Sequence, residues 1–111
     1  MEISNSVQNE ITVVHVAGSI DALTAETLTH ALMEQIQAGV TQLVADLSGV
    51  DYTSSAGLRS ILGAQKAIRS NGGDLRLAGV QPNVLKVLKL SGFTSIFKTF
   101  DDNASAVSSF R

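Results

Sequence analysis

Two neighbouring serines, Ser54 and Ser55, are the residues of this sequence whose type and position could do chemistry. They stand in the stretch DYTSSAGLRS, residues 51–60, between an apolar segment and an amphipathic one. A serine at the start of a helix accepts hydrogen bonds from backbone N–H groups that the helix leaves unpaired, which is a structural role. One hydroxyl suffices for that role. The second is therefore a candidate for modification or for contact with another molecule.

The residues that follow the serines are small for the start of a helix. Ala56 and Gly57 come next, and glycine costs up to about 1 kcal/mol relative to alanine inside a helix. Small side chains there would leave the backbone and the hydroxyl open to an approaching molecule. Further along, positions at helical spacing form an outward stripe that contains another glycine: Arg59, Gly63, Lys66 and Ser70. A glycine on a solvated helix face has no packing role and suits close contact with a partner.

Other motifs for catalysis or ligand binding are missing from the sequence. It has no G-x-x-x-x-G-K-[ST] phosphate loop, no G-x-G-x-x-G and no G-x-S-x-G nucleophile motif. The two histidines, His15 and His30, belong to different expected elements and match no metal-ligand spacing, so no metal or cofactor is expected. His15, inside an apolar strand, is expected to be a hydrogen-bonded strand residue.

Three carboxylates, on Asp21, Asp46 and Asp51, fall at or just after the ends of expected strands. Such a grouping could serve acid–base catalysis, but aspartate is also favoured at these places because it caps turns and helices. A small hydrolase that uses Ser55 and one of these aspartates is one alternative. It lacks a histidine in a suitable element, and we expect the protein not to be an enzyme.

Alternating strand and helix patterns position these residues. Strands are expected over residues 11–20, 42–48, 74–80 and 95–100, and residues 1–7 can pair with the first of them across a turn at 8–10. Helices are expected over residues 23–39, 58–70 and 82–90, with a terminal one starting near Asp102 or Asn103. Strands joined through helices require crossovers. The expected fold class is therefore α/β: a mixed, partly parallel sheet of four or five strands covered by about four helices.

The start of the first expected helix carries two local signals. Thr24 is the expected N-cap, with Glu26 placing a negative charge in the first turn. Leu23 is expected to pack on Leu28 as a hydrophobic staple. Gly39 is expected to end the helix, because glycine takes the positive φ of a helix exit at no steric cost.

Length and charge bound the possible functions. A chain of 111 residues is expected to form one domain over residues 1–111. The net charge is -2 and the eight basic residues are scattered, which argues against a nucleic-acid partner. There is no cysteine for a disulfide, no signal-peptide pattern at the start, and no apolar stretch near the ~20 residues that cross a bilayer. A cytoplasmic protein with no membrane partner is expected.

The stretch from Leu43 to Phe93, around LVADLSGVDYTSSAGLRS, resembles the signature of STAS domains, specifically the stand-alone anti-sigma-factor antagonists of bacteria. GSIDALTAETL, residues 18–28, is similar to the Gly-x-x-Asp element of that family. The resemblance implies that Ser55, two residues before a Gly-Leu pair, is phosphorylated by a partner. This partner would be both a serine kinase of the histidine-kinase-like ATPase type and an anti-sigma factor.

The resemblance also implies a cycle. The unphosphorylated form would bind the kinase and free a sigma factor, the phosphorylated form would be released, and a serine phosphatase would reset the switch. The residue before the acceptor is commonly aspartate in the family, whereas here it is Ser54, which is the alternative acceptor.

Physical chemistry indicates how such a switch would act. A phosphate adds about -1.5 to -2 charges, and a helix N-terminus favours a negative charge by about 0.3–1 kcal/mol, so the domain should stay folded. The partner would read the added charge and bulk. The expected partner-binding residues are Asp21, Thr53, Ser54, Ala56, Gly57, Arg59, Gly63 and Lys66. The alternative function is a constitutive STAS scaffold module in a signalling complex, in which Ser55 only caps the helix.

Overall fold

The computed structural model describes residues 1–110, which form one five-stranded sheet and four α-helices. In chain order the elements are β1 (Glu2–Gln8), β2 (Ile11–Ala17), α1 (Thr24–Gln37), β3 (Gln42–Gly49), α2 (Ser55–Ser70), β4 (Asp74–Ala78), α3 (Pro82–Leu90), the 3-10 helix η1 (Phe93–Ser95), β5 (Thr99–Phe100) and α4 (Asn103–Ser108).

The strands stand in the sheet in their chain order, from β1 to β5. β1 and β2 form an antiparallel hairpin, and each later pair of neighbours is parallel. The hairpin turns at Asn9 and Glu10, whose φ angles are 52° and 71°. Two positive φ angles belong to the primed two-residue turn, which matches the twist of the strands. The predicted mixed sheet is confirmed, and so is the pairing of the N-terminal residues with the next strand.

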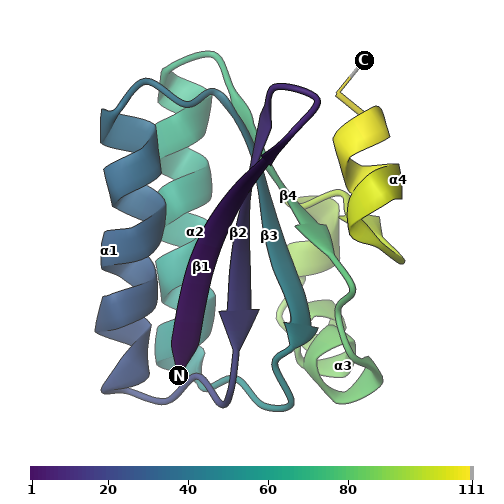
Figure 1. Ribbon diagram of the computed structural model, residues 1–111. Helices are drawn as coiled ribbons and strands as arrows, with labels where there is room; N and C mark the ends of the chain where they lie inside the picture. The colour runs from purple at the N-terminus through teal and green to yellow at the C-terminus, as the bar shows by residue number, and fades with distance from the viewer. Residues whose placement is uncertain (111) are drawn as a thin grey trace.

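Helices cover both faces of the sheet (Figure 1). On one face α1, α2 and α3 enclose the larger core, to which the sheet contributes residues such as Val14, Leu43 and Leu75. On the other face α4 covers a smaller core around Val13 and Val44. Neighbouring residues of one strand thus enter different cores, as the period of two in a strand requires. Burial on both sides explains why the parallel strands are almost continuously apolar.

The last predicted strand, residues 95–100, is wrong over most of its length. Only Thr99–Phe100 form β5, because Ser95 belongs to η1, which follows Gly92 at a φ of 75°. After η1 the chain carries Phe97 into the larger core, where it is 3% exposed. Burial of this aromatic ring therefore overrides the strand propensity of the segment.

The start of α1 also differs from the prediction. The Asp21 Oδ1 atom accepts hydrogen bonds from the backbone N–H groups of Leu23 and Thr24, both at 2.9 Å. Thr24 Oγ1 accepts in return from the Asp21 N–H at 2.8 Å, and Thr24 is the first residue of the helix. The prediction that Thr24 is the N-cap is therefore wrong, since Asp21 provides the capping side chain. The hydrophobic staple is wrong as well, because Leu23 is 84% exposed.

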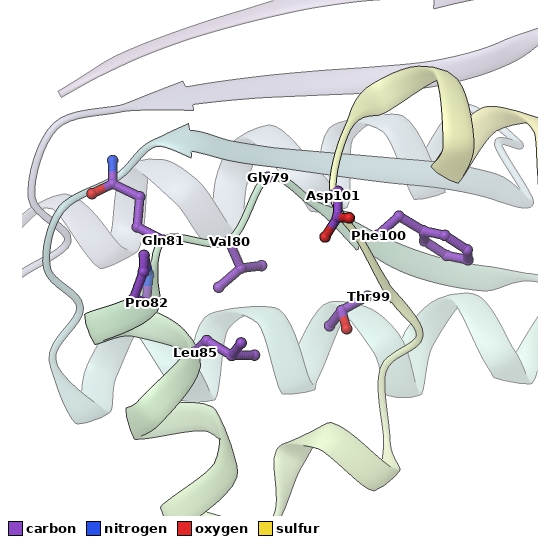
Figure 2. Close-up of a pocket in the computed structure, with 8 residues that line it drawn as sticks. All are labelled: Gly79, Val80, Gln81, Pro82, Leu85, Thr99, Phe100 and Asp101. Carbon is purple, nitrogen blue, oxygen red and sulfur yellow. The ribbon is translucent and has the colours of Figure 1, made fainter.

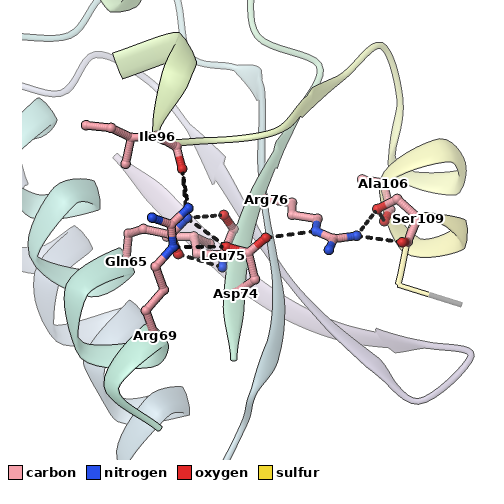
Figure 3. A network of polar contacts seen from close by, with 8 residues as sticks. All are labelled: Gln65, Arg69, Asp74, Leu75, Arg76, Ile96, Ala106 and Ser109. Atoms are coloured by element: carbon pink, nitrogen blue, oxygen red, sulfur yellow. Dashed lines mark hydrogen bonds and ion pairs between the residues drawn. The ribbon is translucent and has the colours of Figure 1, made fainter. Parts of the chain in front are cut away.

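A polar network anchors the C-terminal half of α2 to β4 (Figure 3). The Gln65 side chain is almost fully buried and donates to Asp74 Oδ1 at 2.9 Å. Arg69 and Arg76 pair with the same carboxylate, at 3.5 and 3.0 Å. Arg76 also donates to the backbone oxygen of Ser109, at the end of α4. The network fixes α2 against the sheet and so fixes where its N-terminus lies.

Candidate functional site

The two serines have different places at the start of α2. Ser54 is the N-cap: its backbone is extended and its Oγ accepts from the Gly57 N–H at 3.4 Å. Ser55 is the first helical residue and is exposed. Within residues 1–110 the Ser55 hydroxyl takes part in no hydrogen bond. The helix starts at Ser55, three residues before the predicted start at Leu58. The Ser54 hydroxyl caps the helix, while the Ser55 hydroxyl stays exposed.

The loop before α2 is held against the loop before α1. Ile20 and Thr53 form an isolated parallel bridge, in which the Ile20 N–H donates to the Tyr52 oxygen at 2.9 Å. The Ser54 N–H donates to the Ile20 oxygen at 2.8 Å. These bonds extend the pairing of β2 and β3 beyond the strands. Ser55 consequently stands on a fixed frame, beside the turn that contains Asp21.

Gly57 is small for a reason other than the one the sequence suggested. It is buried, and a Cβ atom placed on it would lie 2.3 Å from Thr53 Oγ1 and 2.6 Å from Ile20 Cγ2. Thr53 is itself buried, at 7% exposure. The expectation that Gly57 leaves the surface open is therefore wrong. Gly57 and Thr53 support the loop from beneath, and they would act on a partner by shaping the loop.

The remaining predicted residues form an exposed surface. Arg59, Gly63 and Lys66 are exposed along α2, and a Cβ on Gly63 would meet no atom within 4 Å. Ala56 is half-buried beside Ser55. Asp21 is exposed, and its hydrogen bonds from Thr24 hold the pKa of its carboxyl below the usual value. Asp21 thus remains an anion beside the loop as well as a helix cap.

Sequence reasoning missed two large apolar side chains beside this surface. Leu23 is 84% exposed and Tyr52 is 54% exposed, and the paired loops carry one each. An exposed tyrosine is a frequent anchor in protein–protein contacts. The Asp21-x-x-Thr24 spacing was the available signal, since a reciprocal cap between these residues leaves no need for a staple at Leu23.

The three aspartates named above do not form a catalytic group with Ser55. Asp21 caps α1, and Asp51 accepts a hydrogen bond from Ser19 Oγ at 3.0 Å. Asp46 bonds to the His15 ring. In the described part of the chain no histidine or carboxylate bonds to Ser55. The alternative of a hydrolase built on Ser55 therefore has no support in the geometry.

A polar chain runs across the first three strands instead. His15 Nδ1 lies 2.7 Å from Asp46 Oδ2, and His15 Nε2 lies 2.8 Å from Ser6 Oγ. His15 is a hydrogen-bonded strand residue, as predicted. The order serine, histidine, aspartate is also that of a hydrolase, which additionally needs N–H donors aimed at the oxyanion. The amides around Ser6 lie in the plane of the sheet, roughly at right angles to its side chain. We therefore infer that the hydrogen bonds joining Ser6, His15 and Asp46 stabilise the fold.

Asp46 should make the fold sensitive to acid. Burial raises the pKa of its carboxyl, but hydrogen bonds from Asn103, Ser48 and His15 outweigh burial and bring the pKa to about 2. A carboxyl with a lowered folded-state pKa stabilises the fold above pH 4, and this contribution is lost as the pH falls from about 4 to 2. Asp46→Asn should lower the free energy of unfolding at pH 7 by about 2 kcal/mol.

Urea unfolding of the two proteins at pH 7 and at pH 2.5 measures this effect. The difference between wild type and Asp46→Asn should shrink at the lower pH, and a difference that stays constant would contradict the assignment. Asp101→Asn, at an exposed position, is the control and should change stability by less than about 0.5 kcal/mol.

A hollow of about 320 Å³ lies elsewhere, where the chain leaves β4 and β5 (Figure 2). Val80, Leu85, Thr99 and Asp101 surround it, while the Phe100 ring points away. Its lining residues are Gly79, Val80, Gln81, Pro82, Leu85, Thr99, Phe100 and Asp101. Among these eight, Asp101 is the one ionisable residue, so the hollow holds neither a pair of catalytic groups nor a metal-ligand set.

Two further features are absent from residues 1–110. No group of three or more histidines and acidic residues there is placed to hold a metal ion. None of the helices in this range combines the length and the apolar character that a membrane span requires.

Comparison with known proteins identifies the family. The family model described as STAS domain matches residues 2–106. The chain belongs to the STAS domain family. The Bordetella bronchiseptica protein BtrV, whose assigned name is that of an anti-sigma factor antagonist, is 37% identical over 94 residues. That match covers 85% of this STAS protein and 81% of BtrV.

Solved structures share the STAS fold. A Thermotoga maritima protein described as an anti-sigma factor antagonist superposes with a TM-score of 0.90 at 20% identity, over 96% of this chain and 92% of that one. The Bacillus cell fate determinant SpoIIAA in its phosphorylated form gives a TM-score of 0.76 at 20% identity, over 99% and 100%. At these identities the likeness shows the fold, which agrees with the mixed five-stranded sheet described above.

Proposed function

We propose that this STAS domain is an anti-sigma factor antagonist that works by partner switching. Unphosphorylated, it binds an anti-sigma factor that is also a serine kinase of the histidine-kinase-like ATPase type, and a sigma factor is released. Phosphorylation on Ser55 ends the binding, and a serine phosphatase restores it. The cycle would run in the cytoplasm. The observation that carries the proposal is the exposed Ser55 hydroxyl at the first residue of α2, which takes part in no hydrogen bond among the described residues 1–110.

The names of related proteins support the general role. Besides BtrV, an anti-sigma-B factor antagonist of Listeria monocytogenes is 34% identical over 86 residues, 77% of this chain and 75% of that protein. The phosphorylated form in which SpoIIAA was solved supports a phosphate on this fold. The resemblance of the DYTSSAGLRS stretch to the family signature supports Ser55 as the residue that carries the phosphate.

The surroundings of Ser55 suit a phosphate that leaves the domain folded. The first N–H groups of α2 point toward that end of the helix, and the helix dipole favours a negative charge there. The paired loops hold Ser54 in place through its backbone, independently of the Ser55 side chain. Because phosphorylation would change the stability of the domain only slightly, the partner would be the molecule that responds to the phosphate.

The test is phosphorylation in vitro with each purified anti-sigma factor kinase encoded in the source genome, in the presence of ATP. Intact-mass analysis should show one added phosphate on wild type and on Ser54→Ala, and none on Ser55→Ala. Ser54→Ala should fold, although loss of the cap costs about 1 kcal/mol. A phosphate that persists on Ser55→Ala would move the site to Ser54. A kinase that binds but never phosphorylates would make the chain a constitutive docking module.

A further inference from the structure

A groove of about 870 Å³ runs between α1 and α2 and begins beside the Ser55 loop. Its apolar lining consists mainly of small residues: Ala22 from the loop before α1, Ala25 from α1, and Ala56, Gly63 and Ala64 from α2. Hydroxyls hold the helices close beneath it: Thr29 Oγ1 donates to Ser60 Oγ at 2.7 Å, and Ser60 Oγ donates to the Ala25 oxygen at 3.0 Å. The small residues leave the space above these bonds open.

The two walls of the groove carry opposite charges that the chain does not pair. Glu26 lines it from α1 and Arg59 from α2. Within residues 1–110 every ion pair involves Asp46 or Asp74, so Glu26 and Arg59 pair neither with each other nor with another side chain there. A partner complementary to this groove would therefore present a positive charge toward α1 and a negative charge toward α2.

We infer that the groove receives an amphipathic helix of the partner kinase, which rests on the function proposed above. A helix suits a groove between two helices, because its apolar ridge packs onto small residues at close distance. The partner helix would place an acidic side chain against Arg59 and a basic one against Glu26. Gly63 is exposed, and a Cβ added to it would meet no atom within 4 Å, so this helix would come closest to α2 at Gly63.

The same arrangement explains how a phosphate on Ser55 would act. Ser55 and Arg59 are four residues apart on α2, so their side chains are neighbours on one face of the helix. An acidic group four residues before a basic one is the favoured order for an ion pair. The phosphate therefore takes Arg59 from the acidic side chain of the partner and leaves that side chain unpaired in the interface. Phosphorylation acts on the groove through Arg59.

Affinity measurements with the purified anti-sigma factor kinases of the source genome test the groove. Gly63→Phe should fill the groove and raise the Kd by at least about 30-fold, whereas Ser70→Phe, on the same helix outside the groove, should change it less than about 3-fold. Arg59→Gln should raise the Kd about 10-fold or more, and the control Lys86→Gln on α3 should not. Thermal unfolding verifies that each variant folds.

A double-mutant cycle tests the link to Ser55. If a negative charge at position 55 acts through Arg59, Ser55→Asp should weaken binding far less in the Arg59→Gln background than in wild type. Fully additive effects overturn the link, and wild-type affinity of Gly63→Phe overturns the groove. In that second case a large effect of Ser55→Asp alone would leave the proposed function standing. Failure of every kinase to bind wild type would overturn both.

Discussion

Ser55→Asp is expected to raise the Kd for the proposed partner, an anti-sigma factor kinase, by about 100-fold, which equals about 2.7 kcal/mol. The substitution puts a fixed negative charge where the wild type offers a neutral, exposed hydroxyl. In the interface this charge draws Arg59 away from the partner, and the acidic side chain of the partner that is left unpaired and desolvated costs about 2–5 kcal/mol. Titration calorimetry or biolayer interferometry on the purified proteins measures the change.

The same variant should keep its fold. A negative charge at the first residue of α2 is slightly favourable to the helix, so the melting temperature should shift by no more than a few degrees. Ser54→Asp is the matched control, because aspartate is an equally good N-cap and is the residue that the family commonly has there. It should weaken binding much less. Equal effects of the two substitutions would contradict a specific role of position 55.

Ser55→Ala completes the comparison. It should bind the kinase as tightly as wild type without ATP, and should remain bound when ATP is added. Wild type should dissociate over the same time as phosphate accumulates. If both proteins dissociate alike in the presence of ATP, nucleotide itself controls the complex and the switch on Ser55 is wrong.

Gly57→Ala and Gly63→Ala should change stability in opposite directions, although both replace a glycine of α2. At Gly57 the added Cβ would lie 2.3 Å from Thr53 Oγ1 and 2.6 Å from Ile20 Cγ2, so the paired loops must shift. Forcing an extra methyl group into such a place typically costs about 1–3 kcal/mol. At Gly63 the Cβ meets nothing, and alanine should stabilise the helix by about 0.5–1 kcal/mol.

Urea unfolding of both variants tests this prediction, since their free energies of unfolding should differ by about 1.5–4 kcal/mol. Because Gly57 supports the loop that carries Ser55, Gly57→Ala should also slow phosphorylation of Ser55. A Gly57→Ala variant as stable as wild type would mean that the loops yield easily, and would remove the argument for a fixed frame.

The sequence predicts those features that are local to one element. The apolar run of β3, the stop at Gly39 and the short helix that starts at Pro82 all follow from nearest neighbours, and each lies where it was expected. The two serines at the start of α2 were likewise evident from the sequence. Because the two serines are adjacent at a helix start, Ser54 is the N-cap and Ser55, the first helical residue, keeps an exposed hydroxyl.

The features that the sequence did not predict depend on contacts between distant segments. Gly57 is required by Ile20, which is far away in the chain and comes close only through the pairing of two loops. The path of the backbone after Gly92 depends on the burial of Phe97 in the larger core. The opposite charges of Glu26 and Arg59 become one feature only when α1 and α2 pack side by side, which no periodicity within either helix reveals.

The pairing of Ile20 with Thr53 has a kinetic consequence. Because backbone hydrogen bonds hold this loop against its neighbour, we expect a partner to meet a formed surface that does not have to reorganise before or after the encounter. Stopped-flow traces of complex formation should then show a single phase whose rate rises linearly with partner concentration. The response time of the signal would be governed by how fast enzymes add and remove the phosphate.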